Sequence, residues 1–378
     1  MEEVKVVIDK DIVNKVIPWA KPALWGREKD YVNSALESLW LSGGEYIDRL
    51  ENDFAELFNK EHVLAVCNGT AAIHLPYLAL GLKPGDEVIV PGFSFMAAAN
   101  LALQMNLKPV FAEVDPTTWC IKAEAVERLV SPRTRVIVPV HTYGNVCNMD
   151  ELCALAKKKN LTIIEDCAEA LFSKICGAYC GTFGDCGSFS FQATKTITTG
   201  EGGLVITDNH DLYRKMLLYR SHGLLERGSY NHVLPGHNFR ITNLQAAFGC
   251  AQLEKANVII EKRKGVHEKY CNLLGSQAGW KLQYFRPEVV PVLWAFALKL
   301  DPKAFPQGRD TVIKQLKEKG IETRPGFTAS SLMKIYEPHS LPVCEDLSRN
   351  VISLPSFPSL LDKDIDYICN QLKGLMKK

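Results

Sequence analysis

One lysine stands where a predicted strand meets a glycine-rich turn. Residues 188–203 read SFSFQATKTITTGEGG, so phenylalanines alternate with small polar residues before Lys195 and glycines follow it. That alternation is typical of a strand with one buried face, and glycines let other groups approach the backbone closely. Burial lowers the pKa of a lysine, and a neutral amine can attack a carbonyl. Lys195 is therefore a candidate nucleophile, although most lysines are solvated surface cations.

Apolar strands alternate with helices through the first half of the chain. The predicted strands are residues 63–67, 87–90, 109–114, 136–140 and 161–166, with helices between them, and residues 204–207 form a returning strand. This pattern indicates an α/β fold with a mostly parallel sheet covered by helices on both faces. Ligands of such sheets bind beyond the carboxyl ends of the strands, where the sequence places Thr70, Phe95, His141 and Asp166.

The length of 378 residues suits two domains of unequal size. We predict that residues 1–255 form an amino-terminal segment and a large domain. Residues 256–378 would form a linker helix and a smaller α+β domain, with a strand at 293–300 and a helix at 310–319. A long helical stretch at 242–274 would join the two.

Composition excludes several classes of partner. The net charge is +1, with 23% charged residues, which argues against a nucleic-acid or membrane-surface binder. No apolar run approaches the roughly 20 residues of a membrane span. The first residues, MEEVK, lack the apolar stretch of a signal peptide. These features predict a cytoplasmic protein without a membrane partner.

The twelve cysteines predict reduced thiols rather than a disulfide framework. The dense group of Cys176, Cys180 and Cys186 lacks the paired spacing of a zinc site. We expect no metal there and interpret these cysteines as small core residues.

The segment SFQATK at 190–195, followed by GEGG at 200–203, resembles the lysine motif of the DegT/DnrJ/EryC1/StrS sugar aminotransferases. The resemblance runs from about Pro18 to the carboxyl end. It implies the type I fold of aspartate aminotransferase and a pyridoxal 5′-phosphate (PLP) cofactor bonded to Lys195. It also implies ping-pong transfer of an amino group from L-glutamate to a keto sugar. Family members that are dehydratases lack the lysine, which this chain retains.

The resemblance also implies cofactor contacts. The carboxylate of Asp166, in the motif EDCAEA, would face the pyridine nitrogen, with Glu169 near the phenolic oxygen and Phe95 stacked on the ring. From the residues alone, Asp166 could equally cap a turn, and Phe95 could be ordinary core packing.

The phosphate would lie on the segment NGTAA at 68–72, where a strand becomes a helix whose N–H groups attract anions. Thr70 and Ala71 would bind it there, together with Ser190. Taken alone, Thr70 is as well explained as a helix N-cap. Asn238 matches a family asparagine that reaches the phosphate from a second subunit, so a homodimer is expected.

The acceptor sugar is less defined. His141, Arg240 and Arg324 are candidate substrate contacts, although a structural histidine and surface salt bridges would explain them too. The segment RPGFTASSL at 324–332 lacks the later proline and histidine of many sugar aminotransferases. The acceptor could be a nucleotide-linked 4-keto-6-deoxy hexose, or a sugar without a nucleotide, such as an 8-keto octulosonate of a lipopolysaccharide. A PLP-binding regulator without turnover is a third interpretation, which the intact lysine and carboxylates disfavour.

Overall fold

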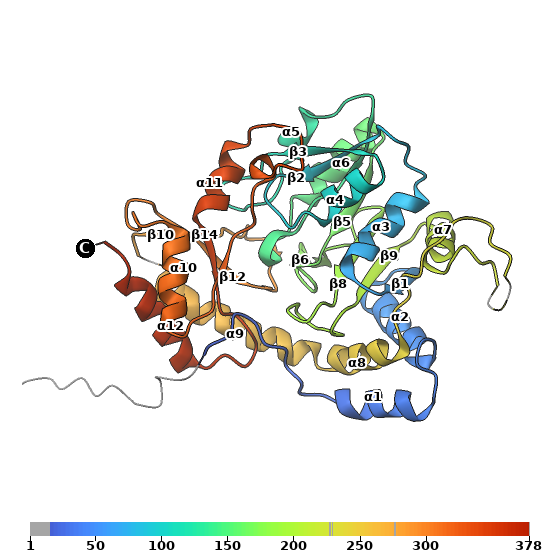
Figure 1. Cartoon of the computed structure of the whole chain (residues 1–378), viewed down its shortest axis with the longest axis horizontal. Helices are drawn as coiled ribbons and strands as arrows, with labels where there is room; N and C mark the ends of the chain where they lie inside the picture. Colours follow the sequence, from blue (N-terminus) through green and yellow to red (C-terminus); the bar gives the residue numbers. More distant parts are fainter. Residues whose placement is uncertain (1–15, 227, 229, 276, 378) are drawn as a thin grey trace, which may run out of the picture.

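The computed structural model of the protein describes residues 16–226, 228, 230–275 and 277–377 (Figure 1). Its main sheet has seven strands in the order β1-β9-β8-β5-β4-β2-β3. β9 runs antiparallel to both of its neighbours, and the other neighbouring pairs are parallel. The strands are His62–Val66 (β1), Glu87–Pro91 (β2), Lys108–Ala112 (β3), Thr134–Ile137 (β4), Thr162–Asp166 (β5), Cys186–Ser190 (β8) and Gly203–Thr207 (β9). The predicted mostly parallel α/β sheet is confirmed.

Helices enclose this sheet. They are Glu28–Glu37 (α1), Glu45–Phe58 (α2), Gly69–Ala79 (α3), Ala97–Gln104 (α4), Ala123–Glu127 (α5), Met149–Lys159 (α6), His210–Arg220 (α7) and Asn243–Glu254 (α8). Among other contacts, α3 packs on β8 and β9, α4 on β2 and β3, and α6 on β5. Every residue of β2, β8 and β9 is buried, as expected for strands covered on both faces. The alternation of phenylalanine and serine in β8 predicted one exposed face, which is wrong, because Phe58 of α2 stacks on Phe189 while Gly69 at the start of α3 lies against Ser190.

A second sheet lies toward the carboxyl end, in the order β10-β12-β14-β13. Its strands are Trp280–Leu282 (β10), Phe296–Leu300 (β12), Arg324–Pro325 (β13) and Val351–Leu354 (β14). The helices Ala256–Leu274 (α9), Arg309–Glu318 (α10), Pro342–Asn350 (α11) and Asp362–Gly374 (α12) belong to this part of the chain. A short sheet of β11 (Val289–Val290), β6 (Lys174–Ile175) and β7 (Ala178–Tyr179) joins the two regions.

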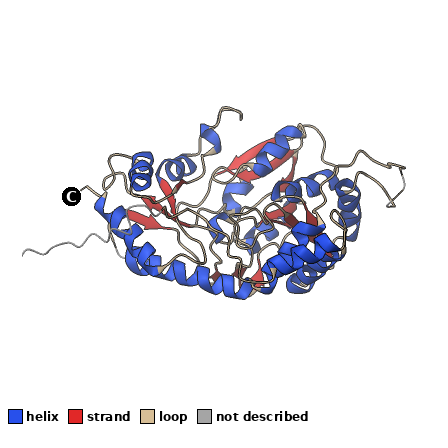
Figure 2. Cartoon of the chain, turned by 60° about the horizontal axis from the view of Figure 1, so that its bottom comes forward, coloured by secondary structure: helices blue, strands red, loops and turns tan. Residues whose placement is uncertain are grey.

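The buried apolar residues form two clusters, one around the main sheet and one between the second sheet and helices α9, α10 and α12. Figure 2, with strands in red, accordingly shows two groups of strands with helices outside them. The helical stretch at 242–274 is two helices, because Lys255 (φ −102°, ψ 5°) interrupts it. This interruption lies at the boundary that we predict between the domains.

None of the described helices is long and apolar enough to cross a membrane. The prediction that no signal peptide begins the chain concerns residues 1–15, which lie outside the described residues.

Candidate active site

A cavity of about 400 Å³ opens at the carboxyl ends of β5 and β8. Its walls combine the main sheet with residues from the carboxyl-terminal part of the chain, Trp294 and Phe327. Most of the predicted cofactor residues line it: Thr70, Phe95, Asp166, Glu169, Ser190 and Lys195. The sequence therefore placed its candidate chemistry at one site, as strand ends of a parallel sheet should.

Lys195 follows strand β8 in a tight, hydrogen-bonded turn. Its backbone N–H donates to the carbonyl of Gln192 at 2.8 Å, and the Gln192 side chain accepts from the N–H and hydroxyl of Thr194. This turn directs the lysine side chain into the cavity, where its Nζ lies 3.9 Å from the centre of the Trp294 ring. Burial lowers the pKa of Lys195, while Glu169 and Asp166 oppose that effect.

Two carboxyl groups share the cavity with this amine. Asp166 ends strand β5 and accepts a hydrogen bond from the Ala168 N–H at 3.0 Å, while burial raises its pKa. Glu169 accepts from the Tyr143 N–H at 2.8 Å, and burial raises its pKa to about 7 although Lys195 acts to lower it. Within the described part of the chain, neither carboxylate forms an ion pair with Lys195 at 4.0 Å or less. The carboxyl groups of Asp166 and Glu169 therefore share the cavity with the amine of Lys195, and neither forms a close ion pair with it.

The start of helix α3 forms an anion cradle. Asn68 is the N-cap, and its side chain accepts from the Ala71 N–H at 2.8 Å. The alternative that Thr70 caps this helix is therefore wrong. Ala71 is buried with its N–H engaged and is not among the lining residues, so its predicted phosphate contact finds no support here. The backbone N–H groups of Gly69 and Thr70 have no hydrogen-bond partner among the described residues and remain free for an anion.

The small residues Gly69 and Ser190 let the start of helix α3 approach the end of strand β8 closely. A Cβ on Gly69 would stand 2.7 Å from the Cβ of Ser190, so only glycine fits beside that strand end. The ring of Phe95 is 66% exposed at the cavity, which does not agree with the ordinary core packing that we considered for it. A free N-terminal cradle, a carboxylate, an amine and an exposed aromatic ring together fit a phosphorylated aromatic aldehyde such as PLP.

His141 lies beside the site, since Val140 pairs with Asp166, but it is not among the residues that line the cavity. It is fully buried; its Nε2 is 3.0 Å from Glu165 Oε2, and its Nδ1 accepts from the Cys147 N–H at 3.2 Å. Both ring nitrogens are engaged, so the predicted substrate contact does not fit this arrangement. His141 instead supports the strand ends, since its backbone N–H donates to the Asp166 carbonyl at 3.1 Å.

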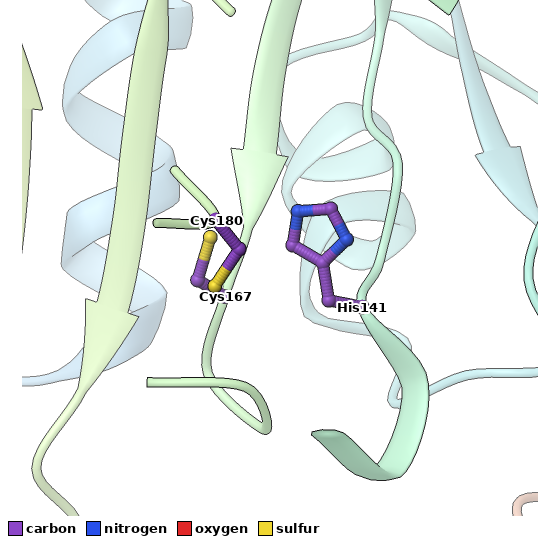
Figure 3. Close-up of side chains that lie close together, drawn as sticks. All are labelled: His141, Cys167 and Cys180. Atoms are coloured by element: carbon purple, nitrogen blue, oxygen red, sulfur yellow. The ribbon is translucent and has the colours of Figure 1, made fainter. Parts of the chain in front are cut away.

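The interpretation of Cys176, Cys180 and Cys186 as core residues is confirmed for Cys180 and Cys186 and wrong for Cys176. Cys176 is exposed, whereas Cys180 lies with Cys167 and His141, their ligand atoms within 4.8 Å of one another (Figure 3). Burial raises the pKa of Cys167, which keeps it a thiol, and the Cys180 thiol donates to the Ala170 carbonyl at 2.9 Å. With the histidine nitrogens also engaged, this cluster is explained as hydrogen-bonded core rather than a metal centre.

The remaining candidates lie outside the cavity of their own chain. Arg240 donates to the side chain of Asn238 at 3.1 Å, and it lines a separate hollow of about 230 Å³ beside residues 39–43. Arg324 is exposed on β13, its guanidinium 5.9 Å from the ring of Trp19. Asn238 is likewise not among the residues that line the cavity of its own chain.

A family model described as the DegT/DnrJ/EryC1/StrS aminotransferase family matches residues 23–373. The chain belongs to this family. It is thus a PLP-dependent aminotransferase, and Lys195, Asp166 and Glu169 line one cavity.

Similar proteins agree with this assignment. The chain is 40% identical to a GDP-perosamine synthase of Escherichia coli O157:H7, over 95% of this chain and 98% of that protein. It is 38% identical to a GDP-perosamine synthase of Vibrio cholerae, over 95% and 99%. Among solved structures, Helicobacter pylori PseC, an aminotransferase of pseudoaminic acid biosynthesis, shares 27% identity with a TM-score of 0.91, covering 96% and 99% of the two chains. GDP-4-keto-6-deoxy-D-mannose-3-dehydratase of E. coli shares 27% identity with a TM-score of 0.88, covering 95% and 100%.

Sequence reasoning missed three residues of this aminotransferase. Trp294 and Phe327 line the cavity from the carboxyl-terminal part of the chain. Arg263, buried on α9, donates to four carbonyls at 3.1–3.2 Å, those of Lys195, Leu293, Trp294 and Ser356. Burial lowers its pKa to about 10, so it stays a cation at neutral pH. Arg263 stands between Lys262 and Lys264, and the only signal was its helical spacing from Ile259 and Val266, which places it on the buried face of α9.

A larger hollow of about 480 Å³ lies at the outer edge of the aminotransferase, between strand β3 and residues 336–339. It contains none of the predicted catalytic or cofactor residues. The smaller cavity is therefore assigned as the active site on its chemistry rather than its size.

Proposed function

We propose that this aminotransferase moves an amino group from L-glutamate to the keto carbon of a GDP-linked 4-keto-6-deoxy hexose. The observation that carries the proposal is the cavity in which Lys195, Asp166 and Glu169 meet an anion cradle. The GDP-linked acceptor follows from the relatives, because 40% and 38% identical proteins of nearly equal length are GDP-perosamine synthases. A structural neighbour is a dehydratase named for GDP-4-keto-6-deoxy-D-mannose, which supports the same class of sugar.

Lys195 has two tasks in this proposal. It bonds the cofactor in the resting enzyme, and once displaced by the donor's amino group its free amine moves a proton to and from the donor's α-carbon. PLP, when bound, would supply an electron-accepting ring and a carbonyl carbon that can take up the amino group and release it. The lowered pKa of Lys195 favours the neutral amine that this proton transfer requires.

The other residues bind and orient. Asp166 would hold the ring nitrogen protonated, and Glu169 would lie near the phenolic oxygen. The N–H groups of Gly69 and Thr70, with the hydroxyl of Ser190, would bind the phosphate, and Phe95 would cover the ring. The free N–H groups and the exposed phenyl ring described above support these roles.

We further propose a homodimer in which Asn238 completes the phosphate site of the partner copy. The position of Asn238 outside its own cavity supports this arrangement. A cytoplasmic location remains our prediction, and the twelve cysteines support it because all of them are free thiols.

The test is the visible spectrum of the purified protein with PLP, before and after addition of L-glutamate without sugar. Binding at Lys195 should give a yellow band that glutamate bleaches and that GDP-4-keto-6-deoxymannose restores. Lys195→Arg should abolish band and turnover while the fold persists, and Lys215→Arg, an exposed lysine on α7, should change neither. Transamination by Lys195→Arg would overturn the proposal. A band that ignores glutamate would instead favour a binding protein without turnover, and restoration only by an octulosonate would refute the GDP-linked acceptor.

A further inference from the structure

Trp294 contacts the one amine of the active site. The Lys195 Nζ lies 3.9 Å from the centre of the indole ring, over its face, which is the geometry of a cation–π interaction. Trp294 is only partly buried because one side of its ring lines the cavity. Since no carboxylate among the described residues pairs with the ammonium within 4.0 Å, the indole face is a principal neighbour of this charge.

The indole ring is fixed in that position. Its N–H donates to the carbonyl of Thr194, the residue before the lysine, at 3.0 Å. Trp19 packs edge-on against it, with ring centres 5.3 Å apart, and Tyr143 stacks at 5.9 Å with an interplanar angle of 12°. A ring held on several sides cannot follow the lysine, so the lysine must move relative to the ring.

The backbones of the two residues are fixed to each other as well. Arg263 donates one hydrogen bond to the Trp294 carbonyl at 3.1 Å and another to the Lys195 carbonyl at 3.2 Å. The indole–Thr194 bond adds a second connection between the same two segments. The backbone segments that carry Lys195 and Trp294 are therefore connected by three hydrogen bonds.

We propose that Trp294 is a positioning residue for Lys195, holding its amine on the indole face whenever that amine is not bonded to a carbonyl. The inference rests on the proposed role of Lys195 and adds a residue to it. In the reaction, the amine must leave the cofactor and return to it. A fixed ring that attracts the charged amine gives it a defined position at the cavity wall. There the ring competes with the carboxyls of Asp166 and Glu169 for the amine.

The alternative is that Trp294 only fills space between the two parts of the chain. Both interpretations predict that removal of the ring lowers activity and stability, so activity alone does not separate them. They differ for the free amine. A ring face that stabilises the ammonium raises the pKa of Lys195, and its loss should lower that pKa. A ring that only excludes water should act in the opposite direction when it is removed.

The experiment titrates Lys195 in the cofactor-free protein. The rate of acylation by an amine-selective reagent is measured at Lys195 from pH 6 to 11 by peptide mass spectrometry. Trp294→Leu should shift the midpoint down by about 0.4 to 1.5 pH units, the size of a partly desolvated cation–π contact. Trp294→Phe, which retains a ring face, should shift it by less than half as much. Trp25→Leu, at a tryptophan outside the cavity, is the matched control and should leave the midpoint unchanged.

A second measurement leaves the packing intact in case Trp294→Leu does not fold. Replacing the six tryptophans by a fluorinated tryptophan weakens the ring quadrupole at nearly constant size. The midpoint at Lys195 should again fall. A midpoint that is unchanged or raised in folded Trp294→Leu, or unchanged with fluorotryptophan, would overturn the proposal. Because neither cofactor nor substrate is present, a failure of the proposed function, such as absent transamination, would not produce these results.

Discussion

The buried carboxyl of Glu169 predicts how the stability of the cofactor-free protein depends on pH. Its pKa is about 7 in the fold, against an ordinary value of 4.5, because burial disfavours the charged form. The folded state therefore holds this proton more tightly than the unfolded chain does. The stabilisation is complete below about pH 4.5 and is lost as the pH rises through about 7.

The size of the effect follows from the shift. Each pKa unit corresponds to about 1.4 kcal/mol, so the full difference approaches about 3 kcal/mol. Glu169→Gln keeps an uncharged side chain of the same shape at every pH, and its carbonyl can still accept from the Tyr143 N–H. The variant should thus exceed the parent's free energy of unfolding by less than about 1 kcal/mol at pH 5 and by about 3 kcal/mol at pH 8.

Urea unfolding of cofactor-free protein, followed by tryptophan fluorescence at pH 5 and pH 8, measures this difference directly. Glu261→Gln, at an exposed position of α9, serves as the control and should change stability by less than about 0.5 kcal/mol at both pH values. If Glu169→Gln differs from the parent by the same amount at pH 5 and pH 8, Glu169 does not titrate between them and the reasoning from burial is refuted.

Two further substitutions test the binding site. Asp166→Asn should retain the fold and lower kcat/KM by about 100-fold or more, since a preorganised charge facing the ring is lost, and turnover near the parent value would exclude that role. Gly69→Ala places a Cβ 2.7 Å from that of Ser190, so calorimetry should show PLP affinity falling at least about 10-fold and stability falling by about 1–3 kcal/mol. Gly265→Ala on α9, where a Cβ meets nothing within 4 Å, is the control and should be neutral or stabilising by up to about 1 kcal/mol. Equal losses of PLP affinity in both variants would show that Gly69 has no specific part in binding the cofactor.

The residues of the main sheet could be predicted because local pattern and topology agree there. Asp166 and Ser190 both end strands, and parallel pairing of β5 with β8 brings these ends together without further information. Lys195 and Glu169 follow within a few residues. The residues that the main sheet contributes to the cavity therefore lie in short segments of sequence, and each segment has a recognisable pattern.

The other half could not be predicted in this way. Trp294 and Phe327 reach the cavity through the packing of the second sheet on the first, which no periodicity in the sequence specifies. His141 shows the converse error, since the end of a strand is a good position for a ligand but does not reveal which way a side chain points. Here the ring turns inward, to Glu165 and the backbone of Cys147.

The four carbonyls to which Arg263 donates also bear on the order in which the chain folds during synthesis. A ribosome releases Lys195 before Arg263, which follows 68 residues later, and Ser356 follows Arg263 by a further 93 residues. Strands and cradle can fold while the chain emerges, because amino-terminal units generally fold first. The turn that carries Lys195 has hydrogen bonds of its own, but its contact with Arg263 forms only after helix α9 has emerged. A chain that ends before residue 356 would therefore keep the main sheet and the turn but would lack one of the four carbonyls that hold Arg263 in place.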